Sequence, residues 1–274
     1  MSSPWRFAAA PFIIGAIYYL YKTFDDPSYA LYIVPFIIIL VIFYVLSPQI
    51  NWFWFKRKPP KLPKPLALFL QKNHRFYQNL SVENKQKFRD RVSLYMKAAD
   101  FMPMVFEKVP TDVQGVAAAC AVQISFGKEN FLFPDYEHII VYPKAFPSPQ
   151  YPRNIHPSEI YDHDGVIMFS AEHLMFGFID PHKYFNVGLH EYAKVFIESY
   201  PTEPWPELDE DTWDRLHEIS GFKKEAIFKY MNIDDITPLA VSIVLFFDFP
   251  QSFKTVLPDL YDLYVTIFNI NPAE

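Results

Sequence analysis

The side chains that could do chemistry centre on one short stretch, His190-Glu191-Tyr192-Ala193-Lys194. On a helix, two histidines four residues apart lie on one face and bind zinc, while the glutamate between them activates the metal-bound water. Here the histidine and the glutamate are present, but Lys194 stands at the second ligand position. By spacing alone, a His-Glu pair is more typical of surface charge or a hydrogen-bonded core histidine.

Other stretches offer little chemistry. Cys120 is the single cysteine, and seven glycines among 274 residues form no glycine-rich phosphate loop. Side chains that could supply a rearranged metal site are His156, Asp162, His163, Asp164, His173, His182, Asp234 and Asp235. Because His and Asp in proline-rich loops usually form turns, that site is the less favoured interpretation. The acidic run 207–211 is interpreted as solvated surface.

The elements that must position His190 and Glu191 are mostly helices. Apolar periodicity and capping residues predict helices over 81–97, 113–126, 186–200, 236–247 and 258–270. Two β-branched runs, 137–143 and 165–170, predict strands. Between them, the 20-residue segment 146–165 is rich in proline and is predicted to form a lid or an edge flap. Helices around a small sheet indicate an α+β domain.

Residues 1–55 have the composition of a transmembrane hairpin. No charged residue occurs between Tyr29 and Phe55, and a helix needs about 20 apolar residues to cross a bilayer. We predict spans over about 5–24 and 29–47, joined by the acidic turn 25–28. The alanines at 8–10 precede the first apolar run, which is the wrong order for a signal-peptide cleavage site.

The charge distribution predicts the topology. Residues 1–64 hold seven Lys and Arg against two Asp, whereas the remainder holds 18 against 29 acidic residues. The proline-rich linker 56–65 carries five of the cations, so the positive-inside rule places both termini and the large domain in the cytoplasm. This basic stretch is interpreted as a topology signal rather than as a site for anionic lipid. An acidic body disfavours nucleic acid as a partner.

Several blocks of sequence together resemble the Mlc titration factor A type of zinc peptidase. They are LSVENKQKFRDRV, VAAACAVQISFG, HIIVYPKAF, GVIMFSAEHLMFG, NVGLHEYAK and LAVSIVLFFDFPQSFKTVLPDLYDLYVTIFNINP, and they follow the family's order over residues 66–272. The resemblance implies a bacterial, zincin-like peptidase domain over 66–274. It also implies a zinc held by an HEFAH-type helix and by a glutamate from a later helix.

Residue by residue, the resemblance assigns His190 as the first zinc ligand and Glu191 as the general base. The departures from the family pattern are Lys194 for the second histidine, Ile197 for a following acidic residue, and Thr237 and Val244 for the two glutamates of EFFAVxSExFF. Catalytic zinc takes three protein ligands, and an ammonium group repels it. We therefore predict that no zinc is bound, and that Lys194 pairs with Glu191 or Glu198 instead.

The resulting prediction is a pseudo-peptidase of the bacterial inner membrane, which binds or regulates an unidentified protein partner beside the lipid bilayer. Two alternatives stay open. One is an active, membrane-tethered zinc metallopeptidase with ligands recruited from elsewhere. The other is a structural subunit of a membrane assembly, since small residues such as Gly15 permit close packing of helices.

Overall fold

The computed structural model describes residues 4–105, 107–161 and 164–273. It divides into two compact units, Met1–Pro60 and Lys61–Glu274.

The first unit is a pair of packed helices followed by a shorter one. Its elements are α1 (Pro4–Lys22), η1 (Pro27–Tyr29), α2 (Ala30–Val45) and α3 (Ser47–Arg57). The Asp26 side chain accepts a hydrogen bond from the Ser28 backbone N–H at 2.9 Å and closes the turn between α1 and α2. Gly15 allows the two helices to approach, because a Cβ there would lie 2.4 Å from the Phe36 ring.

Among the described residues, only Pro27–Val45 is both long and apolar enough to cross a membrane, by length and composition. The predicted pair of spans is therefore confirmed in part, and the span over 5–24 is not confirmed. The reason is composition: α1 has 19 residues, but it includes Arg6, Lys22 and a run of alanines and is less apolar than α2.

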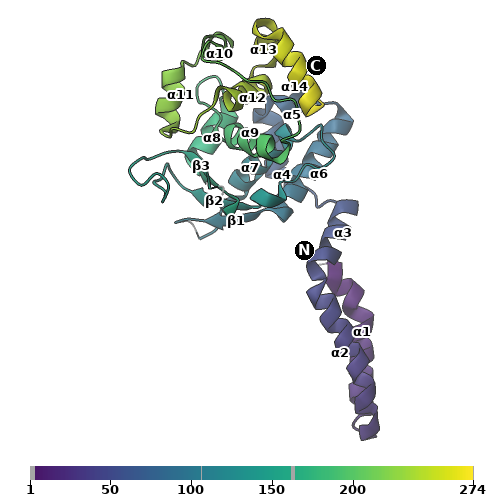
Figure 1. Cartoon of the computed structure of the whole chain (residues 1–274). Coiled ribbons are helices and arrows are strands. Elements are labelled where there is room, and N and C mark those ends of the chain that lie inside the picture. Colours follow the sequence, from purple (N-terminus) through teal and green to yellow (C-terminus); the bar gives the residue numbers. More distant parts are fainter. Residues whose placement is uncertain (1–3, 106, 162–163, 274) are drawn as a thin grey trace. The chain divides into compact units, whose positions relative to one another are not determined.

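The second unit is mostly helical with one small sheet, which confirms the predicted α+β class (Figure 1). Its helices are α4 (Lys64–Asn73), α5 (Arg75–Asn79), α6 (Val82–Ala98), α7 (Thr111–Ile124), η2 (Pro134–Tyr136), α8 (Ala171–Ile179), α9 (Val187–Ser199), α10 (Thr212–Ser220), α11 (Lys224–Met231), α12 (Pro238–Asp248), α13 (Pro250–Val256) and α14 (Pro258–Phe268). Its strands are β1 (Asp100–Pro103), β2 (His138–Tyr142), β3 (Ser158–Tyr161) and β4 (Val166–Ser170).

The strands lie in the order β1-β2-β4-β3, with β3 antiparallel to β4 and the other pairs parallel. Strand β3 stands at one end of this order and is therefore an edge strand, with Ser158 paired to Phe169 and Tyr161 to Val166 of β4. The sequence predicted two strands, and β1 and β3 were missed. Each has only four residues, and β3 lies inside the proline-rich segment 146–165 that was predicted to form a lid or an edge flap.

Helix α7 forms the centre of the core. Its residues from Val116 to Ile124 are all buried, and α6, α8 and α9 pack against it. Alanine predominates in this stretch, so neighbouring helices approach its backbone closely. Gly188 of α9 is an example, because a Cβ at that position would lie 2.7 Å from the Cys120 sulfur. This contact fixes the N-terminal part of α9, which carries His190 and Glu191.

Candidate functional site

Helix α9 presents His190 and Glu191 in its first turns, and both are fully buried. Asn186 caps the helix, since its side-chain oxygen accepts a hydrogen bond from the Leu189 N–H at 3.1 Å. The cap and the close approach of Gly188 to α7 hold this end of α9 rigidly against the core. The predicted site residues are thus in an ordered, water-excluded position.

Glu191 is the centre of a hydrogen-bonded group between α9 and the edge strand. The Ser158 hydroxyl of β3 donates to Glu191 Oε1 at 2.7 Å, and His190 Nδ1 lies 3.1 Å from the same oxygen. If Nδ1 carries the proton, His190 Nε2 is left with a lone pair. Neither Nε2 nor Glu191 Oε2 has a hydrogen-bond partner among the described residues, although both atoms are buried.

Lys194 lies beside this group. Its ammonium forms an ion pair with the Asp235 carboxylate and lies 3.9 Å from Glu191 Oε2. The predicted pairing with Glu191 is therefore present, whereas Glu198 accepts a hydrogen bond from the Tyr136 hydroxyl. Asp235 as the close partner was missed, because no sequence period links residues 41 positions apart.

The charges around Glu191 keep it ionised. Burial raises the pKa of its carboxyl, but His190, Lys194 and the Ser158 hydrogen bond together outweigh burial and lower the pKa to about 2. A general base works best when its pKa lies near the working pH. The Glu191 carboxylate is thus a stable anion held by fixed partners and a weak proton acceptor.

The other two assigned positions carry no metal-binding group. Val244 is buried in the interior of α12, and Thr237 caps that helix by accepting a hydrogen bond from the Ala240 N–H at 3.2 Å. Within the described ranges, no group of three or more His, Cys, Asp or Glu side chains could hold a metal ion. Among the assigned ligand positions, His190 alone carries a donor that suits zinc, and its Nε2 has no hydrogen-bond partner in the part of the chain that the structure describes. The donor set at these positions therefore does not fit the family's metal.

The alternative ligands are scattered and have other partners. His156 Nε2 lies 2.8 Å from Glu159 Oε2, His173 Nδ1 lies 2.9 Å from the Ser170 hydroxyl, and His182 accepts a hydrogen bond from Arg75. Asp164 and Asp234 are exposed, as are the charged residues of the run 207–211, while Cys120 is buried. Asp162 and His163 lie outside the described residues.

The proline-rich segment before β3 is anchored rather than loose. The Asn154 side chain donates to the Asn232 carbonyl at 3.0 Å, and the Asn232 side chain donates to the Ile155 carbonyl at 3.1 Å. The pKa of the Tyr151 hydroxyl is raised, chiefly by burial and then by the negative charge of Asp235. The positive charge of Lys194 on α9 acts in the opposite direction. The segment is therefore fastened to the end of α11, and Tyr151 lies within electrostatic reach of Lys194.

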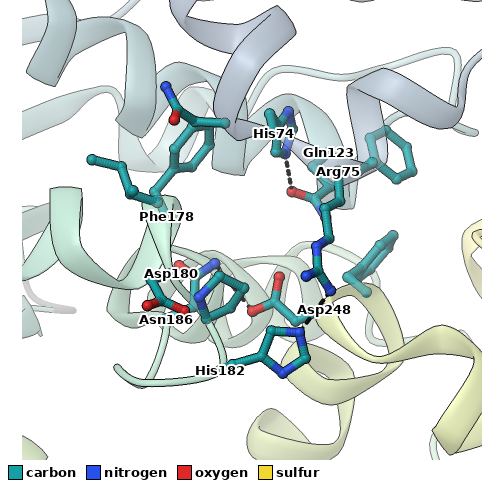
Figure 2. A pocket seen from close by; sticks show the side chains of 13 residues that line it. His74, Arg75, Gln123, Phe178, Asp180, His182, Asn186 and Asp248 are labelled. Atoms are coloured by element: carbon teal, nitrogen blue, oxygen red, sulfur yellow. Dashed lines mark hydrogen bonds between the residues drawn. The ribbon is translucent and has the colours of Figure 1, made fainter.

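A small pocket outside the predicted site was missed. Figure 2 shows His74, Arg75, Asn186 and Asp248 around a cavity of about 60 Å³, room for very few waters. The Asn186 amide donates to Asp248 Oδ2 at 3.2 Å, which ties the start of α9 to the end of α12. Burial raises the pKa of the Asp248 carboxyl to about 7. The hydrogen bond between Asn186 and Asp248 thus joins α9, which carries His190 and Glu191, to α12, which carries Val244.

Comparison with known proteins agrees with the sequence resemblance. The family described as glucose-regulated metallo-peptidase M90 matches residues 51–269, which is most of the chain. A comparison with curated proteins returned no match. The match covers α9 with its His190-Glu191 pair, the sheet, and the helix α12 that carries Val244. The chain therefore belongs to the M90 metallopeptidase family, that of Mlc titration factor A.

Proposed function

We propose that this chain is a membrane-anchored member of the M90 family that has lost zinc and catalysis and that binds or regulates a protein partner. The observation that carries the proposal is the position of Lys194. Its ammonium stands one helical turn after His190 and pairs with both Asp235 and Glu191. The Lys194 ammonium thus compensates the charge of the Glu191 carboxylate. In a peptidase of this family, the metal would lie beside that carboxylate.

The proposed anchoring rests on the first unit. Helix α1 packs against α2 through Gly15 and Phe36. The backbone N–H of Trp5 also donates a hydrogen bond to the side-chain oxygen of Asn51 in α3 at 3.1 Å. Because α1 pairs with the apolar α2 in a hairpin, we propose that both helices cross the bacterial inner membrane. The five cations that follow α2 favour a cytoplasmic position for both termini and the second unit.

One observation favours the alternative of an active metallopeptidase. His190 Nε2 is buried and has no hydrogen-bond partner among the described residues, as a zinc ligand would be in the absence of its metal. A partner residue or a rearranged segment would have to supply the missing donors. The third reading, a structural subunit of a membrane assembly, rests on the helical hairpin alone.

The deciding experiment measures zinc per chain by elemental mass spectrometry. Full-length protein without a histidine tag is purified in mild detergent with no added metal. A matched variant, Lys194→His with Val244→Glu, restores the family's donor set and serves as the positive control. We expect close to zero zinc in the natural chain and a measurable gain in the double variant after zinc is added and excess removed.

About one zinc per natural chain would overturn the proposal. In that case His190→Ala would show whether the metal lies at the assigned position. Glu191→Gln then separates the two functions: it abolishes peptide cleavage by an enzyme, whereas a binding protein carrying it still retains its partner in a pull-down.

A further inference from the structure

Helix α4 begins the second unit with an unusual outer face. Its inner face buries Leu66 and Leu70 in the core. On the other side, Lys64, Leu68 and Lys72 recur every four residues and therefore lie on one face. All three are exposed, and Leu68 is 70% exposed although it is apolar. We call these residues, with the exposed Lys61 just before the helix, the α4 stripe.

The charged residues that neighbour the α4 stripe along the sequence are all of one sign. No Asp or Glu occurs between Asp26 and Glu83, while that interval holds seven Lys and Arg. None of the three lysines of the stripe forms an ion pair with any residue in the described ranges. From Glu83 onward the balance reverses, with 16 Lys and Arg against 29 Asp and Glu. The second unit is thus basic at its first helix and carries a net negative charge from Glu83 onward, although α6 within that part holds five Lys and Arg against two acidic residues.

We propose that the α4 stripe docks on the anionic lipid headgroups of the membrane in which the chain is anchored. This inference rests on the proposed anchoring. Lysine ammonium groups attract the phosphates of a negatively charged leaflet, and a leucine between them adds apolar contact below the headgroups. From Glu83 onward the unit carries a net negative charge, which the same surface repels. Charge complementarity, the exposed Leu68 and the short distance in sequence from the span together favour α4 as the face that meets the bilayer.

The α4 stripe contains features that a topology signal does not require. A positive-inside signal requires only cations close to the end of a span, and Lys56, Arg57 and Lys58 already supply three. Lys72 lies about two helical turns after Lys64 on the folded helix α4. The positive-inside rule explains neither Lys72 nor the exposed Leu68. Because α4 is folded onto the core through Leu66 and Leu70, docking of the stripe orients the whole second unit.

Depth-dependent quenching tests the contact in the full chain. Gln71, exposed on α4 beside the stripe, is replaced by cysteine and labelled with an environment-sensitive fluorophore, since the natural Cys120 is buried. The chain is reconstituted in nanodiscs with brominated lipids, either purely zwitterionic phosphatidylcholine or with added phosphatidylglycerol. A label at exposed Glu225 of α11 is the matched control. We expect quenching at position 71 to be at least about twofold greater with phosphatidylglycerol, and to fall in high salt.

Charge reversal separates the stripe from general attraction. Lys64→Glu with Lys72→Glu is expected to abolish the lipid-dependent quenching, each reversal reducing contact about fivefold or more. Lys229→Glu, an exposed lysine of α11, is the matched control and leaves quenching unchanged. Equal quenching in the two lipids, or no response to the α4 reversals, overturns the proposal. Suppression by millimolar inorganic phosphate alone would also overturn it, because it would indicate a small-anion site.

Recovery of the chain with the nanodiscs reports separately on anchoring. If the chain is not retained in discs of either lipid, the proposed anchoring fails. The stripe is then tested on the same full chain with free vesicles: binding to phosphatidylglycerol vesicles that depends on Lys64 and Lys72 would support it, and the absence of such binding would refute it.

Discussion

Replacing Lys194 by methionine tests whether its ammonium compensates the buried Glu191 carboxylate. Methionine has a similar length and no charge, so the change removes the cation and little volume. Lys194 is 16% exposed and Glu191 is fully buried, with 3.9 Å between the charged atoms. Glu191 would keep the hydrogen bond from Ser158 and the contact with His190.

The size of the effect follows from that distance. Two unit charges 4 Å apart attract by about 4 kcal/mol at an effective dielectric constant near 20. The desolvation of Lys194 offsets part of this, and its other partner Asp235 is 53% exposed, so that pair contributes little. We expect Lys194→Met to lower the free energy of unfolding by about 2 kcal/mol at pH 7.5. Asp235→Asn, the comparison variant, should cost less than about 1 kcal/mol.

The pH dependence gives the sharper test. The pKa of Glu191 is about 2 in the folded protein, below its ordinary value, so its stabilising effect is present at neutral pH and is lost as the pH falls toward 2. Removing Lys194 raises that pKa, and the variant therefore loses less stability on acidification. The difference between variant and natural chain should be largest at neutral pH and should shrink as the pH falls toward 2.

Urea titration of the full chain in mild detergent, followed by tryptophan fluorescence, measures both quantities. Glu191→Gln in the Lys194→Met background should recover part of the lost stability, because no buried anion remains to be compensated. A variant as stable as the natural chain at pH 7.5, or one whose deficit grows on acidification, would refute the electrostatic role of Lys194.

Three further perturbations have definite signs. Asp248→Asn should raise the melting temperature at pH 8 more than at pH 5. The pKa of this carboxyl is raised to about 7 in the folded protein, so the free energy of unfolding falls as the pH rises to about 7, and the amide removes this loss. An equal shift at both pH values would contradict this. Asn232→Ala removes the side-chain bond to the proline-rich segment at a residue with φ of 53°, so limited proteolysis within 149–153 should speed up several-fold, with no change expected from exposed Lys229→Ala. Gly15→Leu places a side chain against Phe36 and should reduce the recovery of folded protein in detergent, whereas Ile14→Leu, at an exposed position, should not.

The parts of the fold that follow from sequence are those with strong local patterns. The helices α6, α9, α12 and α14 lie within about two residues of the predicted ranges, because capping residues and apolar periodicity mark them. The strand β3 had no such signal: its Glu159 is buried, and the contact of its carboxylate with His156 Nε2 depends on the folded structure. Short edge strands that depend on tertiary partners are invisible to local pattern.

The candidate site divides in the same way. The family pattern assigned Lys194 to the position of the second zinc ligand, and that assignment stays a prediction. The pairing of Lys194 with Glu191 follows from helix geometry and is present in the structure. Asp235 lies in the loop between α11 and α12, and Ser158 lies in β3. Their contacts with Lys194 and Glu191 therefore depend on the tertiary fold. The pocket at Asp248 was missed for the same reason, since Asn186 and Asp248 are 62 positions apart.

The retention of Glu191 without the second histidine has a physical explanation. A carboxylate buried completely in a protein core is costly unless a cation or several donors compensate it. In a chain that loses its metal-binding residues, an unaltered Glu191 would destabilise the fold, so either the carboxylate must be replaced or a cation must come from the protein. Lys194 lies one turn along the same helix, where its ammonium reaches both Glu191 and the solvent-facing Asp235. If zinc is lost as proposed, the ammonium of Lys194 accounts for how the buried Glu191 carboxylate stays compensated in the fold.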